Sequence, residues 1–261
     1  DSTMRYFHTG YHYLKKFHTV VTFHHLFPGK LRELSMKSIL NKVSMAVVHT
    51  DEIETKIKGY GCKNVMTIHY PCFLSVKPLE KEKGKIKILL SLGGTRYDKG
   101  LDILLDALNR VQEEFRLIIA GKEEFFVKDA IEAAVKNYRD KVELHLEFLS
   151  NEDMISYLQS SDIIVLPYRK EFDGASGPLC EGAYLGKTII GPNHGSLGVI
   201  IDKNHLGYCF ESENSESLAA CISGALKHEF VYDQCAKDYQ KSLNPDFFLQ
   251  KYTVLYHGLC Q

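Results

Sequence analysis

The chain has 261 residues, which is long enough for one large or two modest hydrophobic cores that need no disulfide or metal staple. Its 32 Lys and Arg nearly balance 33 Asp and Glu, which excludes a generally basic protein that binds nucleic acid. No apolar run approaches the ~20 residues of a transmembrane helix. Seven scattered cysteines, with no Cys-x-x-Cys pair, favour reduced thiols in a cytoplasmic protein over structural zinc.

The charge is unevenly distributed along the chain. Residues 1–75 carry 10 Lys and Arg against 5 Asp and Glu, whereas residues 76–261 carry 22 against 28. The basic first part suggests peripheral contact with an anionic membrane surface, at the inner face of the membrane, or with an acidic glycan. A plain solvated surface explains the same excess equally well.

Strand-like and helix-like segments alternate almost throughout. Short apolar runs rich in Val and Ile predict buried parallel strands at 19–23, 45–49, 65–69, 86–92, 116–120, 163–166, 188–190 and 208–210. Helical periodicity marks 101–111, a segment that Ser150 caps, a segment opening near Gly177, and the tail 247–259. This alternation predicts an α/β fold with a doubly wound parallel sheet.

Residues 71–84 form the expected linker, with two prolines followed by a charged stretch that has no apolar face. We therefore expect a partial α/β domain over 1–75, a fuller α/β domain over 76–244, and a final helix over 245–261. The first part has only about three strands, fewer than the usual ~4–6 of a sheet. Either the chain is a fragment or it is a natural short form.

The loop after the strand at 86–92 contains Gly93 and Gly94, then Arg96 and Lys99. Glycines let the backbone approach a ligand closely, and two cations suit a diphosphate. The loop matches neither the Gly-x-Gly-x-x-Gly dinucleotide fingerprint, which disfavours an NAD-dependent oxidoreductase, nor a P-loop. A solvated turn with ordinary surface cations is about as good an interpretation of this loop alone.

The loop after the strand at 163–166 contains small residues that open a helix near Gly177, between the carboxylates of Asp173 and Glu181. Free amides at a helix N-terminus form an anion site. Carboxylates beside such a site repel phosphate unless they hold hydroxyl groups, so the mixture points to a sugar nucleotide. The alternative is that both acids favour the positive end of the helix dipole.

These loops occur in a familiar order. Lys99-Gly100-Leu101-Asp102, the strand ending Leu117-Ile118-Ile119-Ala120-Gly121, and the spacing of Asp173 to Glu181 resemble the nucleotide-sugar domain of retaining family-4 glycosyltransferases of the GT-B fold. The resemblance covers about residues 85–260. Residues 19–75 are more loosely similar to the second half of that family's acceptor domain, and the tail 247–259 resembles the helix that crosses back to it.

The resemblance implies a role for each matching position. Arg96 and Lys99 would contact the donor diphosphate, together with the backbone around Gly93 and Gly94. The further anion-binding amides would be those of Ala175, Ser176 and Gly177.

The same resemblance implies how the donor's other groups are held. Glu181 would hold the ribose hydroxyls and Asp173 the hydroxyls of the transferred sugar. The backbone around Phe148 and Leu149 would face the base, and His24 or His25 would lie near the anomeric carbon.

The family needs no metal and no cofactor beyond the nucleotide-sugar substrate. Its chemistry implies transfer to a glycan or lipid-linked acceptor, with the departing diphosphate receiving the acceptor's proton. The chain departs from the family in having Asp173 in place of Glu, in placing Arg96 two residues late, and in a short first domain. A non-catalytic nucleotide-sugar-binding or scaffold protein is therefore the alternative function, and a sugar-nucleotide epimerase would need acid and base residues that the sequence does not show.

Overall fold

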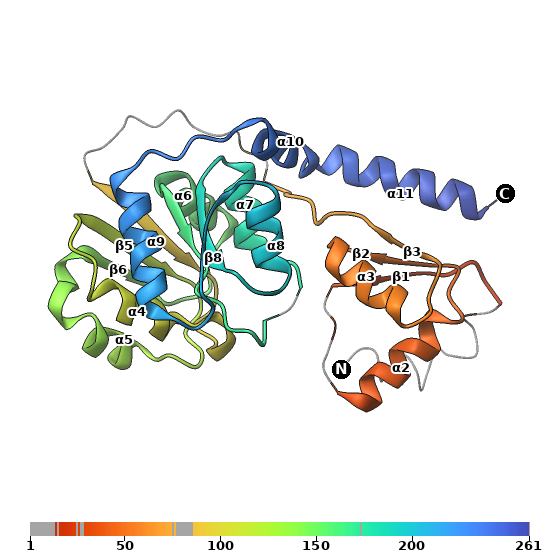
Figure 1. Ribbon diagram of the computed structural model, residues 1–261, viewed down its shortest axis with the longest axis horizontal. Helices are drawn as coiled ribbons and strands as arrows, with labels where there is room; N and C mark the ends of the chain where they lie inside the picture. Colours follow the sequence, from red (N-terminus) through yellow and green to blue (C-terminus); the bar gives the residue numbers. More distant parts are fainter. Residues whose placement is uncertain are drawn as a thin grey trace. The chain divides into compact units, whose positions relative to one another are not determined.

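The computed structural model describes residues 14, 16–24, 26, 29–74, 76, 86–172 and 174–260. The chain divides into two compact units (Figure 1). The first consists of residues 1–71, 173–175 and 243–261, and the second of residues 72–172 and 176–242. Each unit contains its own parallel sheet.

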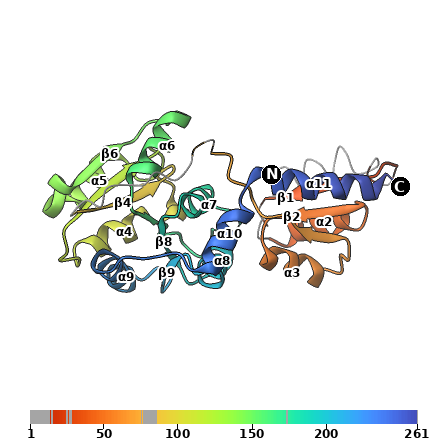
Figure 2. The same ribbon diagram turned by 90° about the horizontal axis from the view of Figure 1, so that it is seen from above.

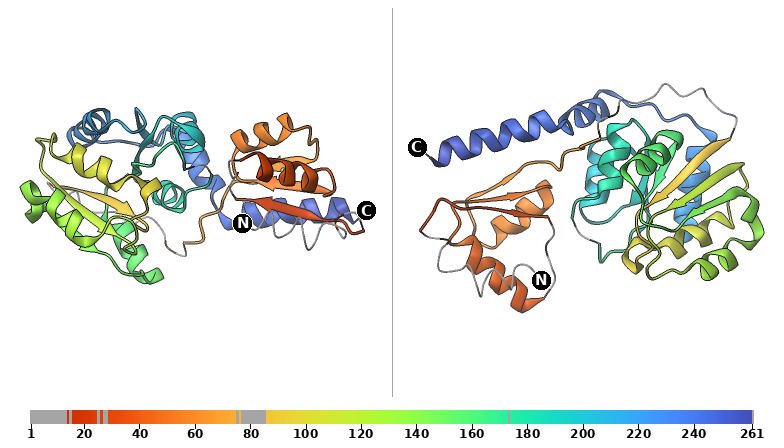
Figure 3. Two further views of the ribbon diagram at one scale, coloured as in Figure 1. Left: turned by 90° about the horizontal axis from the view of Figure 1, so that it is seen from below. Right: turned by 180° about the vertical axis from the view of Figure 1, so that it is seen from behind.

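The first unit contains a parallel sheet in the order β1-β2-β3, formed by Val20–Phe23, Met45–Val48 and Val65–Thr67. Helices α2 (Lys30–Leu40) and α3 (Asp51–Gly59) cover one face of this sheet, and α11 (Pro245–Leu259) covers the other (Figure 3). Leu255 of α11 is buried against Val47 and Ile68, and Tyr252 Oη lies 2.9 Å from Thr22 Oγ1. Residues far apart in the sequence therefore share one small core.

The second unit contains a larger parallel sheet in the order β6-β5-β4-β7-β8-β9. Its strands are β4 (Lys87–Leu92), β5 (Phe115–Ala120), β6 (Val142–His145), β7 (Ile163–Val165), β8 (Thr188–Pro192) and β9 (Gly207–Phe210). The predicted doubly wound α/β fold is confirmed. The order reverses direction between β4 and β7, and such a switch point is where open α/β sheets bind their ligands.

Helices cover both faces of the larger sheet. The helices are α4 (Leu101–Leu108), α5 (Lys128–Ala134), α6 (Asn151–Ser160), α7 (Gly177–Tyr184), α8 (Gly195–Lys203), α9 (Ser215–Lys227) and α10 (Gln234–Ser242), with short 3-10 turns η1 (Tyr97–Lys99) and η2 (Lys136–Lys141). Ile163 of β7 shares a core with α4, α5 and α9, and Figure 2 shows α4 beside α9. The next residue, Ile164, lies under α7, where a Cβ on Gly182 would come within 2.7 Å of its side chain. The alternation of Ile163 and Ile164 is the period of a strand buried on both faces.

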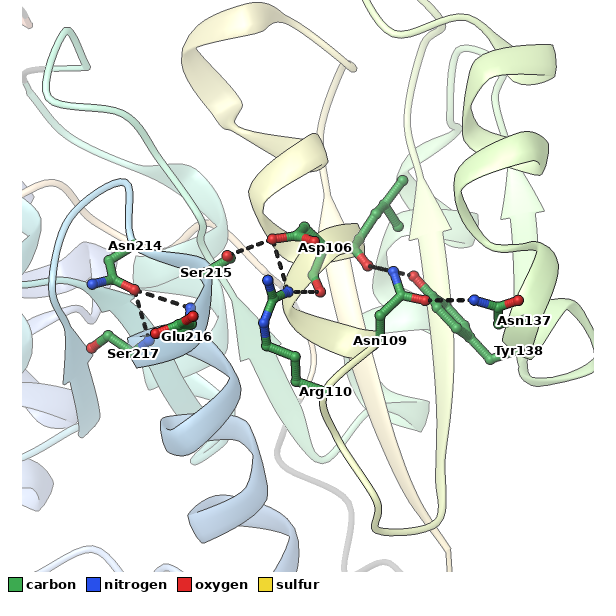
Figure 4. A network of polar contacts seen from close by, with 10 residues as sticks. Asp106, Asn109, Arg110, Asn137, Tyr138, Asn214, Ser215, Glu216 and Ser217 are labelled. Carbon is green, nitrogen blue, oxygen red and sulfur yellow. Dashed lines mark hydrogen bonds and ion pairs between the residues drawn. The ribbon is translucent and has the colours of Figure 1, made fainter.

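Polar side chains fix where several helices begin and end. Ser150 Oγ accepts from the Asp153 amide at 3.1 Å, which confirms the predicted cap of α6. Asn214 caps α9 in the same way, and Ser215 at the start of α9 hydrogen-bonds Asp106 of α4 at 2.5 Å (Figure 4). Arg110 pairs with the same carboxylate at 2.8 Å, so this network joins two helices of one face.

The strand β6 was not expected from the sequence. Only Val142 of its four residues is buried. Glu143 is exposed and the other two are half-buried, because the strand lies at the edge of the sheet. In the described part of the chain, no helix combines the length and apolar character that crossing a membrane requires.

Candidate functional site

A small pocket opens at the carboxyl ends of β4 and β7, at the switch point of the larger sheet. It is lined by Ser91, Leu92, Gly93, Gly94, Thr95, Lys99, Leu101, Ile119 and Tyr168. Three residues predicted for the diphosphate site, Gly93, Gly94 and Lys99, therefore lie together in the structure.

Thr95 fixes the glycine loop that forms one wall of the pocket. Its side chain is only 3% exposed, and its hydroxyl donates to Phe126 O at 2.8 Å and accepts from the Glu124 amide at 2.8 Å. The Gly93 amide donates to Ala120 O at 2.8 Å. The loops after β4 and β5 are thus held against each other, which leaves the two glycines as a backbone surface for a ligand.

Lys99 is the cation of this pocket. Its Nζ lies 2.5 Å from Tyr168 Oη, 3.8 Å from the centre of the Tyr168 ring and 4.7 Å from that of Phe172. No carboxylate among the described residues lies within ion-pair distance of this ammonium group. Aromatic rings orient Lys99 without neutralising it, so its charge is available to an anion.

Gly100 makes this arrangement possible. Its φ is +63°, and a Cβ there would lie 2.0 Å from Pro167 O, the backbone that follows β7. The two carboxyl-end loops can approach this closely only at a residue without a side chain. The glycine of the Lys-Gly-Leu-Asp motif therefore has a packing role as well as a conformational one.

Arg96 is oriented differently from Lys99. Its guanidinium group donates to both carboxylate oxygens of Asp98, at 2.9 and 2.6 Å, and it does not line the pocket. This pairing raises the pKa of Arg96 and outweighs the opposing effect of burial. This ion pair uses two of the five N–H donors of the Arg96 guanidinium group.

Arg169 was not singled out from the sequence, although it supports the site. It donates to both carboxylate oxygens of Asp102, at 3.0 and 2.7 Å, and stacks 4.0 Å from the centre of the Tyr97 ring. Its side chain is only 10% exposed. The sequence did contain one signal for this pair. Asp102 of the Lys-Gly-Leu-Asp motif is a carboxylate that an arginine following a neighbouring strand can bind through two hydrogen bonds.

Helix α7 begins beside Tyr168. Ser176 is its N-cap and accepts from the Leu179 amide at 3.4 Å, while Ser176 Oγ lies 3.5 Å from Tyr168 Oη. Gly177 is the first helical residue, as predicted. Asp173 lies outside the described residues, and Ala175 belongs to the first unit.

Glu181 lies one turn into α7, with its carboxylate turned back toward the N-terminus of the helix. A Cβ placed on Gly177 would be 3.7 Å from Glu181 Oε1. Burial raises the pKa of the Glu181 carboxyl above its usual range. Among the described residues, none forms a hydrogen bond or ion pair with this carboxylate. A half-buried carboxylate in this state can accept hydrogen bonds from a ligand.

Other predicted residues lie outside this pocket. Phe148 follows β6 with its side chain 87% exposed, and Leu149 next to it is half-buried. Cys180 is buried, and burial raises the pKa of its thiol to about 12, as in a packing residue rather than a nucleophile. Nowhere in the described chain do three or more His, Cys, Asp or Glu gather in a way that could hold a metal ion.

His24 belongs to the first unit, where it follows β1. Its Nδ1 lies 3.1 Å from Nε2 of His49, which follows the neighbouring strand β2. His25 lies outside the described residues. Thr50, which follows His49, caps α3 by accepting from the Ile53 amide at 3.3 Å. The pairing of His49 with His24 was not foreseen.

Comparison with known sequences adds a family to this geometry. Residues 75–242 match the family described as Glycosyl transferases group 1. An uncharacterized glycosyltransferase of Methanocaldococcus jannaschii is 29% identical over 153 residues, which is 59% of this chain and 42% of that protein. The D-rhamnosyltransferase WbpZ of Pseudomonas aeruginosa is 30% identical over 132 residues, 46% of this chain and 33% of that protein. The chain thus matches less than half the length of these relatives.

Solved structures share the fold. Sucrose-phosphate synthase from Thermosynechococcus elongatus has a TM-score of 0.77 at 18% identity, over 93% of this chain and 68% of that one. HepE from Anabaena, solved in complex with UDP and glucose, has a TM-score of 0.73 at 14% identity, over 92% of this chain and 71% of that one. Both share with this chain the GT-B fold expected from the sequence.

Proposed function

Because the chain belongs to the group 1 glycosyl transferases, we propose that it transfers a sugar from a nucleotide-diphosphate donor to a hydroxyl of a glycan or lipid-linked acceptor. The transfer retains the anomeric configuration. The solved complex of HepE with UDP and glucose supports a donor of this chemical class.

The observation that carries the proposal is the Glu181 carboxylate. It is half-buried, its pKa is raised by burial, and the described residues supply it with no hydrogen-bond donor. Two adjacent ribose hydroxyls would donate to its two oxygens. Each hydrogen bond to a charged group is worth about 1.5–3 kcal/mol, which is enough to offset the cost of keeping the carboxylate out of water.

The diphosphate would lie between Lys99 and the first turn of α7. Lys99 carries a positive charge with no carboxylate partner among the described residues. At the start of α7 the Gly177 amide is the one left for an anion, because Pro178 has no N–H and the Leu179 amide donates to Ser176 Oγ. The Gly93 and Gly94 backbone allows close approach. We propose that this set holds the donor without a metal ion, so activity is expected to persist in EDTA.

Transfer follows from the charge that develops on the leaving group. The bond between the anomeric carbon and the diphosphate oxygen breaks as the acceptor oxygen bonds to that carbon, and the acceptor's proton passes to the departing diphosphate. Lys99 would stabilise the growing negative charge on the diphosphate, which is the form of electrostatic catalysis that lowers barriers most. Asp173 would hold the hydroxyls of the transferred sugar.

Isothermal titration with UDP, GDP and ADP tests the donor site. We expect at least one nucleotide to bind, and Glu181→Ala to weaken its binding about 10- to 100-fold, the equivalent of one lost hydrogen bond to a charged group. Glu132→Ala is the matched control, because Glu132 is a helical glutamate of α5 whose carboxylate lies 3.6 Å from Arg139. If no nucleotide binds, or both variants bind like the native chain, the assignment of the site is wrong.

Arg96 favours the second candidate, a nucleotide-sugar-binding protein without turnover, because Asp98 holds its guanidinium group away from the pocket. The two candidates differ in one measurement. Release of free nucleotide from a panel of nucleotide sugars in the presence of acceptors supports transfer. Tight nucleotide binding with no release supports the second candidate.

A further inference from the structure

We propose that His49 is a positioning residue that fixes the ring tautomer of His24, so that His24 Nε2 offers a lone pair to a hydroxyl of the sugar or its acceptor. The inference rests on the proposed function for the identity of that hydroxyl. The arrangement of protons between the two rings follows from the first unit alone.

The two histidines meet because of strand register. β1 and β2 are parallel, and Phe23 lies opposite Val48. The next residues, His24 and His49, therefore emerge side by side at the carboxyl edge of the small sheet. Their ring centres are 4.8 Å apart, and His24 Nδ1 is 3.1 Å from His49 Nε2.

The proton on His49 can be assigned from its other partner. His49 Nδ1 lies 2.9 Å from the carbonyl oxygen of Ile68. A carbonyl oxygen only accepts, so Nδ1 carries the proton. The residue is only 4% exposed, and burial disfavours a charged ring. In the neutral ring, Nε2 is then an acceptor.

The assignment propagates to His24. Because His49 Nε2 accepts, His24 Nδ1 must be the donor in their hydrogen bond. The neutral His24 ring has one proton, so its Nε2 carries a lone pair. The His24 side chain is exposed, and its Nε2 has no hydrogen-bond partner among the residues that the structure describes.

Tyr70, which follows β3 by three residues, packs against both histidines. Its ring stands edge-on to His49, at 5.3 Å and 88°, and to His24, at 6.4 Å and 75°. These contacts restrict rotation of both imidazoles. The result is a chain of hydrogen bonds that begins at a fixed backbone carbonyl and ends at a solvent-facing acceptor nitrogen.

The consequence concerns which hydrogen bond His24 can make. A neutral histidine in water favours the tautomer with the proton on Nε2, which would make that nitrogen a donor. His49 selects the opposite tautomer. His24 can then accept from a sugar or acceptor hydroxyl and raise the electron density on that oxygen.

The tautomer is measurable without any substrate. In the chain labelled with ¹⁵N-histidine, long-range ¹H–¹⁵N correlation above pH 8 should show His24 protonated on Nδ1, with the signal assigned through its loss in His24→Gln. His49→Phe should shift the His24 proton to Nε2. His49→Gln should restore the native pattern, because its amide oxygen can accept from His24 Nδ1. A native His24 protonated on Nε2 would overturn the proposal.

Transfer kinetics separate a positioning role from a structural one. We expect His49→Phe to lower kcat by about tenfold or more, as the loss of one hydrogen bond to the reacting hydroxyl in the transition state does, with the Kd for nucleotide unchanged. His49→Gln should recover most of that loss. Equal kcat for both variants would overturn the positioning role, whatever the tautomer. A failure of the native chain to bind any nucleotide would instead refute the proposed function and leave the tautomer result as the test of His49.

Discussion

The close approach at Gly100 allows a test in which the size of the effect follows from the structure. In Gly100→Ala, the new methyl group would lie 2.0 Å from Pro167 O, far inside the 3.0 Å that real Cβ contacts respect. The atom it meets is backbone, so a side-chain rotation cannot relieve the overlap. The left-handed conformation itself costs a non-glycine residue about 1–2 kcal/mol, and overpacking costs a further ~1–3 kcal/mol.

Gly186 is the matched control, because it has the same left-handed conformation as Gly100 but room for a methyl group. It lies in the same unit after α7, its φ is +70°, and a Cβ there would meet Gln240 Nε2 at an ordinary 3.6 Å. Gly186→Ala should therefore lower the free energy of unfolding by only ~1–2 kcal/mol, and Gly100→Ala by about 2–5 kcal/mol, the sum of the conformational and overlap costs.

Urea unfolding followed by circular dichroism measures both values, since the chain has no tryptophan for fluorescence. Gly100→Ala should also weaken nucleotide binding, because Lys99 is the preceding residue and its distance to Tyr168 depends on this approach. Equal losses of stability in the two variants would refute the reasoning, since the overlap with Pro167 would then contribute nothing.

Two further predictions concern titratable groups. Burial raises the pKa of Cys180 to about 12, so iodoacetamide at pH 8 should modify the exposed Cys235 and spare Cys180 until the chain is unfolded. Peptide mass spectrometry would identify the modified cysteines. Labelling of Cys180 in the folded chain would contradict its burial. The second group is Glu54, whose pKa lies below its usual value. Burial alone would raise this pKa, but the hydrogen bonds from Lys58 and Thr67 lower it by more. The stabilisation by Glu54 is therefore complete above the unfolded-state pKa and is lost as the pH falls through the lower folded value. Thr67→Val should reduce the free energy of unfolding more at pH 7 than at pH 3, whereas a loss that does not vary with pH would refute this linkage.

The sequence was sufficient for the architecture because each local signal agreed with the fold. Buried parallel strands carry continuous apolar runs, and Ser150 followed by an acid three residues later marked the start of α6. The strand β6 escaped because an edge strand needs only one buried residue, here Val142. A run of four residues with one buried side chain cannot be distinguished from a surface loop in the sequence.

The site was predictable as a set of loops and less so as a set of contacts. Gly93, Gly94 and Lys99 meet because carboxyl ends of neighbouring parallel strands share an edge. The sequence could not show that Asp98 pairs with Arg96, because the order of residues in a loop does not fix which way its side chains point. The roles of Asp173 and Glu181 toward a donor remain predictions.

The packing of α11 has a consequence for how the first unit forms during synthesis. Thr22 and Tyr252 are 230 positions apart, and the buried face of the small sheet at Val47 and Ile68 is covered by Leu255. A ribosome would therefore release β1–β3 long before the helix that shields them. Until then, the apolar face of those strands stays open to water, and the larger sheet between them in sequence can fold first. The order of domain completion would be the reverse of the order of the strands along the chain.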